Sequence, residues 1–415
     1  MVQQGPRELD VVVHGATGFA GRLVAEHLAR HAPPGVSVGL SGRSADRLAQ
    51  VRDGLGARAQ QWPLLVADAH DDDALRDVAR RARVVASTVG PYERFGLPLT
   101  RACAAEGTDY VDLTGEVLFM RTSIDANDET ARATGARLVH ACGFDSVPSD
   151  LGVLLLARAA ATHGLGELGR TRFVLTGASG GFSGGTVDSM RAQVDRMRDD
   201  REARRLVADP YALSPDRAVE PDRTVDGPGD GPDSWGVSWD ADAGRWLAPF
   251  VMGPVNSRVV RRSNALSGYA YGRGFTYREA VGMPGRVLGA PLAAGLAAGT
   301  GGLGLAMAVP VTRRLLDRVL PAVGTGPDEA AREAGWFAVR LHSRTSTGRL
   351  VQARVTSPGD PGYAATARML GESALALVLD RDRLPDRAGV LTPATALGEV
   401  LVDRLREAGM TLRVL

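Results

Sequence analysis

Three glycines follow a short apolar strand near the start of the chain, and their spacing is typical of an anion-binding turn. Residues Val11 to Gly21 read VVVHGATGFAG, with glycines at positions 15, 18 and 21. The first glycine permits a sharp turn, the second admits a phosphate close to the backbone, and the third lets the next helix pack near the strand. The N–H groups at the helix start would point at the anion. We therefore expect a dinucleotide pyrophosphate to bind at Gly15, Ala16, Thr17, Gly18, Phe19, Ala20 and Gly21.

The second strand, Val36 to Leu40, ends in Ser41, Gly42, Arg43 and Ser44. This point lies about 20 residues beyond the glycines, where an NAD enzyme places an acid for the ribose 2′-hydroxyl. Arg43 can instead bind a 2′-phosphate with two N–H groups, and Ser44 can donate a hydrogen bond. The sequence thus favours NADP, although a solvated arginine beside a helix start is the other interpretation. Asp68, Val89 and Gly90, which end the third and fourth strands, are expected to complete the cofactor site.

The chain has no lysine, since all 49 basic residues are arginine. This excludes a Schiff-base lysine, a P-loop lysine and the Tyr-x-x-x-Lys pair of many short-chain reductases. Chemistry next to a nicotinamide then needs another proton donor, and we expect Tyr92, Asp145 and Ser146 to converge there. A packing role for Tyr92 and a turn or helix-cap role for Asp145 are the alternatives. Asp112, Glu116 and Tyr363 are weaker candidates.

These residues are expected to be positioned by a parallel sheet. Six short apolar strands alternate with helices over the first 150 residues, which predicts right-handed crossovers and ligand binding at the carboxyl ends of the strands. The fold class is therefore α/β: a Rossmann-type doubly wound parallel sheet in residues 1–150, followed by a second, mixed α+β domain in residues 151–390. Residues 391–415 read as a helix and a strand that pack back on the first domain. Strands of the second domain are expected at Thr171 to Leu175, Ser257 to Arg262, Tyr269 to Tyr277, Trp336 to Ser343 and Arg349 to Thr356.

Composition limits the classes of function. A net charge of +1 over 415 residues is not the strongly positive charge that is typical of proteins that bind nucleic acid. Cys103 and Cys142 lie in apolar stretches and are typical of small core residues in a reducing compartment. Seven scattered histidines without an HExxH or CxxC motif predict no metal site. The first residues show no apolar signal segment, so we expect a cytoplasmic protein.

Residues 287–312 contain no charged side chain and lie between Arg286 and the pair Arg313 and Arg314. The segment is long enough to span a bilayer, but Gly301 and Gly302 lie near its middle, which favours two short apolar helices in a hairpin. Burial of this hairpin, as a helix pair or at the contact of a homo-oligomer, is one interpretation. A hairpin that dips into a lipid surface, with peripheral association at the plasma membrane, is the other.

Longer strings in the chain resemble a known family. The sequences VVVHGATGFAGRLVAEHL, SGRS, STVGPYERFGLPLTRACAAEGTDYVDLTGE and HACGFDSVPSDLG resemble saccharopine dehydrogenase-like oxidoreductases. The later strings SGGFSGGT, APFVM, VVRRS, GTGPDEAAREAGWF, DPGYAATARMLGESALAL and GVLTPATALGE resemble its bacterial branch of trans-acting enoyl reductases. The resemblance covers nearly the whole chain.

This resemblance implies NADP-dependent reduction of a C=C bond in a lipid or carrier-bound polyketide acyl chain, within the biosynthesis of complex lipids and glycolipids. It also implies a polyketide synthase as a partner and adds weight to membrane association. Two alternatives stay open: an imine or ketone reductase acting on a small metabolite, and a non-catalytic NADP-binding protein at a lipid surface.

Overall fold

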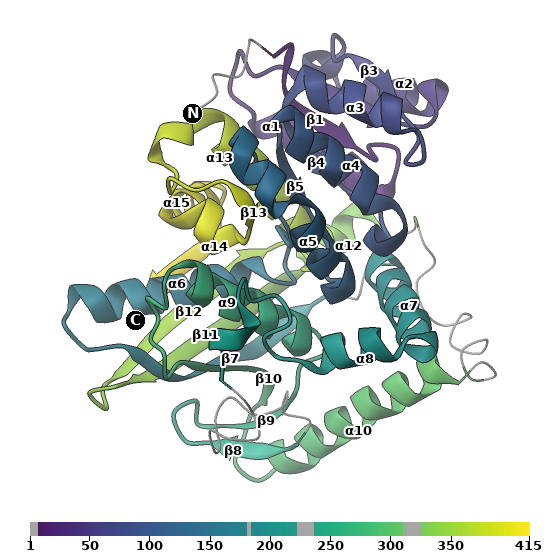
Figure 1. Ribbon diagram of the computed structural model, residues 1–415. Coiled ribbons are helices and arrows are strands. Elements are labelled where there is room, and N and C mark those ends of the chain that lie inside the picture. Colours follow the sequence, from purple (N-terminus) through teal and green to yellow (C-terminus); the bar gives the residue numbers. More distant parts are fainter. Residues whose placement is uncertain (1–6, 181–183, 222–235, 310–311, 313–323, 325) are drawn as a thin grey trace.

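A computed structural model describes residues 7–180, 184–221, 236–309, 312, 324 and 326–415. The chain forms two seven-stranded sheets with helices around and between them (Figure 1). The first sheet has the order β13-β6-β5-β4-β1-β2-β3, and all of its strand pairs are parallel. This arrangement confirms the Rossmann-type doubly wound fold class.

Apolar runs form the strands of the first sheet. They are β1 (Leu9–His14), β2 (Val38–Gly42), β3 (Leu64–Val66), β4 (Ala82–Ser87), β5 (Asp109–Asp112), β6 (Arg137–Val139) and β13 (Gly389–Leu391). Because both faces of a parallel sheet are covered, these strands are almost fully buried.

The helices of the first domain cover the two faces of this sheet. They are α1 (Phe19–His31), α2 (Ala45–Gly54), α3 (Asp72–Arg81), α4 (Tyr92–Glu106) and α5 (Val117–Thr134). One apolar cluster joins α3, α4 and α5 to the sheet, and the other joins α1 and α2 to it together with α13 (Ala364–Leu379) from the C-terminal part of the chain.

The second sheet has the order β14-β12-β11-β7-β10-β9-β8 and is mixed, because β7 and β10 run parallel while its other pairs are antiparallel. Its strands are β7 (Leu168–Ser179), β8 (Ser238–Asp240), β9 (Arg245–Pro249), β10 (Thr276–Met283), β11 (Trp336–Thr345), β12 (Leu350–Pro358) and β14 (Thr411–Val414). This mixed second domain was expected from the sequence, including the β11–β12 hairpin.

The remaining α-helices are α6 (Val147–Thr162), α7 (Gly184–Asp199), α8 (Arg201–Ala208), α9 (Gly253–Leu266), α10 (Gly289–Ala308), α12 (Glu329–Ala334), α14 (Pro393–Ala396) and α15 (Gly398–Glu407). Helices α6 and α9 pack on the second sheet, and α6 also contacts α14 and α15. Short 3₁₀ turns lie at Ala57–Ala59, Arg217–Val219 and Arg381–Arg383.

Helix α9 corrects the strand expected at Ser257 to Arg262. The alternation of valine and arginine in this segment resembles an exposed strand, but all three of its arginines are buried. Each guanidinium donates to backbone carbonyls: Arg258 to Val207, Arg261 to Pro210 and Tyr277, and Arg262 to Leu213 and Val390. Hydrogen bonds of this kind let charged side chains occupy a helix face that points into the protein.

Helix α10 corrects the hairpin expected at residues 287–312. It is continuous through Gly301 and Gly302, and it alone among the described helices is long and apolar enough to cross a membrane. Only 11% of its apolar stretch, within Gly289–Met307, is buried inside the protein. The side chains of Leu292 and Leu305 are 53% and 69% exposed. The buried helix pair is therefore wrong for the described part of this segment. Each glycine weakens a helix by about 1 kcal/mol, which does not suffice to break it.

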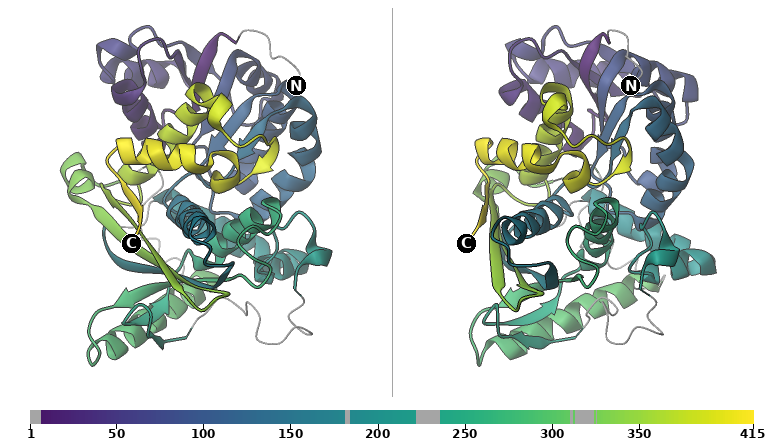
Figure 2. Two further views of the ribbon diagram at one scale, coloured as in Figure 1. Left: turned by 90° about the vertical axis from the view of Figure 1, so that its left-hand side faces the viewer. Right: turned by 60° about the vertical axis from the view of Figure 1, so that its left-hand side comes forward.

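The C-terminal part of the chain contributes to both domains (Figure 2). Helix α13 packs against α1, β1, β4 and β5, and β13 pairs with β6 at the edge of the first sheet. Strand β14 instead pairs with β12 in the second sheet. Of residues 391–415, which the sequence suggested pack on the first domain, α14 contacts β6 of the first sheet and β14 belongs to the second sheet.

Candidate functional site

The glycine turn between β1 and α1 has the shape that a pyrophosphate needs. A Cβ atom at Gly21 would lie 2.2 Å from the Gly15 carbonyl oxygen, and one at Gly15, where φ is +86°, would lie 2.7 Å from a Val89 methyl group. Helix α1 begins after Gly18 without a side-chain cap and without an acidic residue in its first turn. The N–H groups at its start can therefore bind an anion, and the turn fits the pyrophosphate of a dinucleotide.

The end of β2 carries the residues expected at the 2′-phosphate. Ser44 caps α2 by accepting a hydrogen bond from the Arg47 N–H group at 3.4 Å. Arg43 is exposed, and among the described residues no carboxylate forms an ion pair with it. Asp68 lies near enough for the charge of Arg43 to help lower its pKa, after the larger effect of hydrogen bonds from His70. Arg43 thus remains open to a phosphate at the carboxyl edge of the sheet.

Thr88 is a residue of this turn that sequence reasoning missed. Its hydroxyl donates to the carbonyl oxygens of His14 and Gly15, both at 3.3 Å, and so ties the end of β4 to the glycine turn. A signal for it exists in the sequence, because a small hydroxyl residue directly follows the fourth apolar strand. The contact explains why the segment that ends in Val89 and Gly90 approaches Gly15 so closely.

Tyr92 lies inside the protein, where its hydroxyl bonds to the backbone. The hydroxyl donates to the Ser87 carbonyl at 3.0 Å and accepts from the Leu113 N–H group at 3.2 Å. Burial raises the pKa of Tyr92 well above its ordinary value, and the charge of Asp112 adds to this effect. A group that is bonded on both sides and has a raised pKa is a poor proton donor, so we revise its expected role from catalytic to structural.

Two weaker candidates also have structural partners. The Glu116 carboxylate accepts from the N–H groups of Tyr92 and Glu93 at 2.9 and 2.8 Å, which caps the start of α4. The Asp112 carboxylate accepts from the Ala141 N–H group at 3.0 Å and lies 2.7 Å from His140 Nδ1. These carboxylates satisfy backbone donors at the start of α4 and just after β6.

Asp145 differs from these residues because its carboxyl group has no such partner. It follows β6, its side chain is half-buried, and no hydrogen bond to this carboxyl is recorded within the described ranges. Burial raises the pKa of Asp145 to about 6. A Cβ atom at Gly115 would lie 3.6 Å from its Oδ2 atom and 3.2 Å from the Met252 methyl group. The carboxyl therefore lies at the ends of β5 and β6, beside the second domain.

Ser146, the neighbour of Asp145, belongs to a buried network that the sequence did not reveal. Its hydroxyl donates to Asn256 Oδ1 at 3.1 Å, and Asn256 Nδ2 donates to Glu279 Oε2 at 2.8 Å. The Oε1 atom of Glu279 accepts from Ser149 at 2.6 Å and from the Tyr277 hydroxyl at 2.7 Å. The alternation Tyr-x-Glu in β10 is a signal that could have shown two polar groups on one buried face. These hydrogen bonds connect α6 to the second sheet and hold the backbone next to Asp145 in place.

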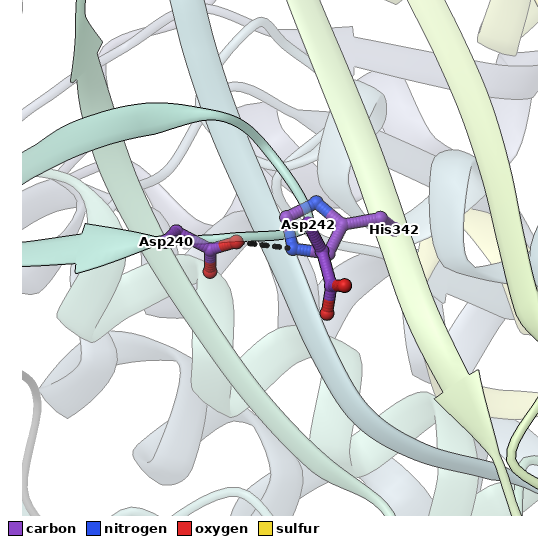
Figure 3. Close-up of side chains that lie close together, drawn as sticks. All are labelled: Asp240, Asp242 and His342. Atoms are coloured by element: carbon purple, nitrogen blue, oxygen red, sulfur yellow. Dashed lines mark ion pairs between the residues drawn. The ribbon is translucent and has the colours of Figure 1, made fainter. Parts of the chain in front are cut away.

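A cluster of metal-ligand type lies apart from this site, on the second sheet. Ligand atoms of Asp240, Asp242 and His342 lie within 4.8 Å of one another (Figure 3). Asp240 Oδ1 lies 3.3 Å from His342 Nε2, Asp240 Oδ2 lies 2.9 Å from Arg172 Nε, and Arg344 Nε donates to Asp242 at 3.0 Å. Because arginines already balance these carboxylates, we interpret the cluster as an ion-pair network.

Burial acts to raise the pKa of Asp240, but hydrogen bonds from His342 and from the Ala243 N–H group outweigh it and hold the pKa at about 2. This carboxylate therefore stays charged within the network at neutral pH.

Comparisons with known proteins agree with this geometry. The family described as the saccharopine dehydrogenase NADP-binding domain matches residues 11–139, which contain the glycine turn and Arg43. Trans-acting enoyl reductases of Mycobacterium ulcerans and Mycobacterium tuberculosis are 47% and 46% identical to this chain, with 98% of this chain and 97% of each relative covered. Saccharopine dehydrogenase (L-Glu forming) of Saccharomyces cerevisiae aligns with a TM-score of 0.48 at 14% identity, covering 98% of this chain and 100% of that structure.

The identities to relatives extend over nearly the whole length of both chains, and the matched domain contains the turn that fits the pyrophosphate of NADP. The chain therefore belongs to the saccharopine dehydrogenase-like family of trans-acting enoyl reductases and is an NADP-dependent oxidoreductase.

Proposed function

We propose that this protein reduces a C=C bond conjugated to a carbonyl in a lipid or carrier-bound polyketide acyl chain, with Asp145 as the proton donor. NADPH supplies a hydride to the β carbon when it is bound. The electron pair of the double bond then moves toward the carbonyl oxygen, and the α carbon must receive a proton. The observation that carries the proposal is the Asp145 carboxyl, which accepts no hydrogen bond from the residues that the structure describes. Its pKa of about 6 keeps roughly a tenth of it protonated at pH 7.

The names of the relatives support this reaction type, because each is called a trans-acting enoyl reductase. We infer from "trans-acting" that the acyl chain is presented by a separate synthase. A place in complex lipid and glycolipid biosynthesis is part of the same proposal, as is a cytoplasmic location.

The test is single-turnover oxidation of NADPH with an α,β-unsaturated acyl thioester. Asp145→Asn should lower the rate by about 10² while leaving NADPH affinity nearly unchanged. Asp150→Asn is the matched control: Asp150 is also buried with a pKa of about 6, but its oxygens accept from Ser263 and from the Ala394 N–H group. Asp150→Asn should lower the free energy of unfolding and leave the single-turnover rate of NADPH oxidation unchanged.

Other outcomes decide between the alternatives. An unchanged rate in Asp145→Asn would remove Asp145 from the chemistry. NADPH oxidation by a small keto or imino acid, but not by any unsaturated acyl chain, would establish a small-metabolite reductase instead. Binding of NADPH without oxidation by either class of substrate would favour a non-catalytic protein at a lipid surface.

We further propose that α10 lies on the surface of a membrane. The helix carries no charge over its 20 residues and exposes Leu292 and Leu305, and Arg286 stands just before it. An apolar helix with arginine at its border suits the interface between acyl chains and headgroups. An acyl substrate is itself apolar, so this location would bring the reductase to where such chains accumulate.

A further inference from the structure

The second domain encloses the first residue of the nucleotide-binding helix. The Phe19 ring lies 4.7 Å from the Tyr363 ring in an edge-to-face arrangement. A Cβ atom at Gly326 would lie 2.4 Å from an edge atom of the same ring, and the Arg332 guanidinium lies 5.4 Å from its centroid. Residues more than 300 positions away in the sequence therefore contact the first residue of the helix that follows the glycine turn.

Arg332, in the short helix α12, has donor groups to spare. One of its Nη1 hydrogens donates to the Pro327 carbonyl at 2.7 Å, and its side chain is half-buried. No ion pair of Arg332 is recorded over the ranges that the structure describes. Burial raises the pKa of the nearby Asp360, and the charge of Arg332 only partly opposes this effect. The Asp360 carboxylate binds the N–H groups of Tyr363 and Ala364 at 3.1 and 3.0 Å. Most of the five N–H donors of the Arg332 guanidinium are thus available to bind an anion.

Backbone hydrogen bonds hold α12 in place, and they therefore hold Arg332 beside Phe19. The Asp360 N–H group donates to the Arg332 carbonyl at 2.8 Å, and the Gly359 N–H group donates to the Gly335 carbonyl at 2.8 Å. A Cβ atom at Gly335 would lie 2.5 Å from the Asp360 backbone, so α12 ends tightly against the loop before α13. On its other side, α12 contacts α1 through Glu329 and Arg30 at 3.8 Å.

We propose that Arg332 is a cofactor-binding residue of the second domain, which binds the pyrophosphate of NADP across the domain boundary. The helix start at Phe19 offers only neutral N–H donors and a partial positive charge, whereas a pyrophosphate carries formal negative charge. Arg22 is the arginine of the first domain in the first turn of α1, and Arg332 adds a second full positive charge from the second domain. This inference rests on NADP binding and does not depend on the C=C reduction proposed above.

The experiment is a set of binding titrations without acyl substrate. Arg332→Ala should raise the Kd of NADPH and of NADH by the same factor, about tenfold or more, because both contain the pyrophosphate. The affinity for adenosine 2′-monophosphate, which lacks the pyrophosphate, should not change. Arg43→Ala should show the reverse pattern, weakening NADPH and adenosine 2′-monophosphate and sparing NADH.

Two further variants control for indirect effects. Glu329→Gln alters the same helix and its contact with Arg30, and it should leave all three affinities unchanged. Arg332→Gln keeps a polar chain without the charge and should reproduce the loss seen with alanine. Unchanged affinity for NADPH and NADH in both Arg332 variants would overturn the proposal. Equal weakening of adenosine 2′-monophosphate would also overturn it, because the effect would then be a distortion of the whole site.

Discussion

The hydroxyl group of Tyr92 donates to the backbone carbonyl of Ser87 at 3.0 Å. The two residues lie at opposite ends of the loop that joins β4 to α4, so the bond closes this loop on itself. The same hydroxyl also accepts from the Leu113 N–H group at 3.2 Å, which ties the loop to the end of β5. One side chain thus holds together two of the strand ends that border the cofactor site.

Tyr92→Phe should therefore lower stability more than activity. The variant loses both hydrogen bonds of the hydroxyl and leaves the partly buried Leu113 N–H group without this partner, which costs about 1–3 kcal/mol. Urea unfolding would measure this loss, while NADPH affinity and the single-turnover rate should stay within a few-fold of the wild type. A rate lowered about 10² with unchanged stability would instead restore Tyr92 as a proton donor.

Arg43→Ala tests the preference for NADP over NAD. The exposed guanidinium has no ion pair to lose within the described structure, so its removal should not affect folding. Loss of a charge-assisted contact to the 2′-phosphate should weaken NADPH by about 1.5–3 kcal/mol, roughly ten- to a hundred-fold, and barely change NADH. A titration that shows equal losses for both nucleotides would disprove this assignment of Arg43.

The raised pKa of Asp145 predicts a pH dependence of the reaction. A proton donor with a pKa of about 6 is fully protonated below that pH, so the rate of the chemical step should fall as pH rises through about 6. The rate in Asp145→Asn should be low and should lack this dependence. Single-turnover rates between pH 5 and 8 would measure both profiles, and identical profiles would exclude the role.

The same pKa predicts a change in stability with pH. The folded state holds the Asp145 proton more tightly than the unfolded chain, so this group lowers stability progressively as pH rises from about 4 to about 6. The full cost persists at higher pH and is at most about 3 kcal/mol, from a shift of roughly two pKa units. Asp145→Asn should accordingly be more stable than the wild type at pH 8 and not at pH 3. If the difference in unfolding free energy between the variant and the wild type did not change with pH, this prediction would be wrong.

Leu292→Asp tests the membrane proposal for α10. The wild type should float with vesicles of mixed neutral and anionic phospholipid, and the variant should stay in solution, because a carboxylate is costly in the acyl region. Thermal unfolding should be unchanged, since Leu292 is largely exposed. If the wild type does not bind vesicles but the variant changes the oligomeric state, α10 is instead a contact between two copies of the chain.

The first sheet and its glycine turn could be predicted because their signals are local. Strands β1 to β6 are short, mostly apolar runs that are closely followed by glycine, serine or acidic residues, and the three glycines lie between the end of β1 and the first turn of α1. The choice of Arg43 likewise needed only the order of strands and the position after β2. These features depend on neighbouring residues, so the sequence displays them.

The rest depends on contacts between distant segments. Arg258, Arg261 and Arg262 looked exposed because a sequence pattern does not show the backbone carbonyls that make their burial possible. The partners of Tyr92, and the lack of a hydrogen bond to the Asp145 carboxyl within the described part of the chain, arise only when β4, β5 and α6 come together. The sequence around Phe19 gave no sign of its contact with Arg332, which helix α12 of the second domain brings to it.

Strand β13 has a consequence for how the protein is made. Residues Gly389–Leu391 complete the edge of the first sheet beside β6, some 250 residues after the strand that they pair with. During synthesis the first domain emerges with the edge of β6 unpaired, and such an edge can pair with other chains. Closing a loop of this length is also slow. The nucleotide-binding domain therefore depends on a segment that is synthesised long after the rest of its sheet, which makes a nascent chain vulnerable to aggregation until that segment arrives.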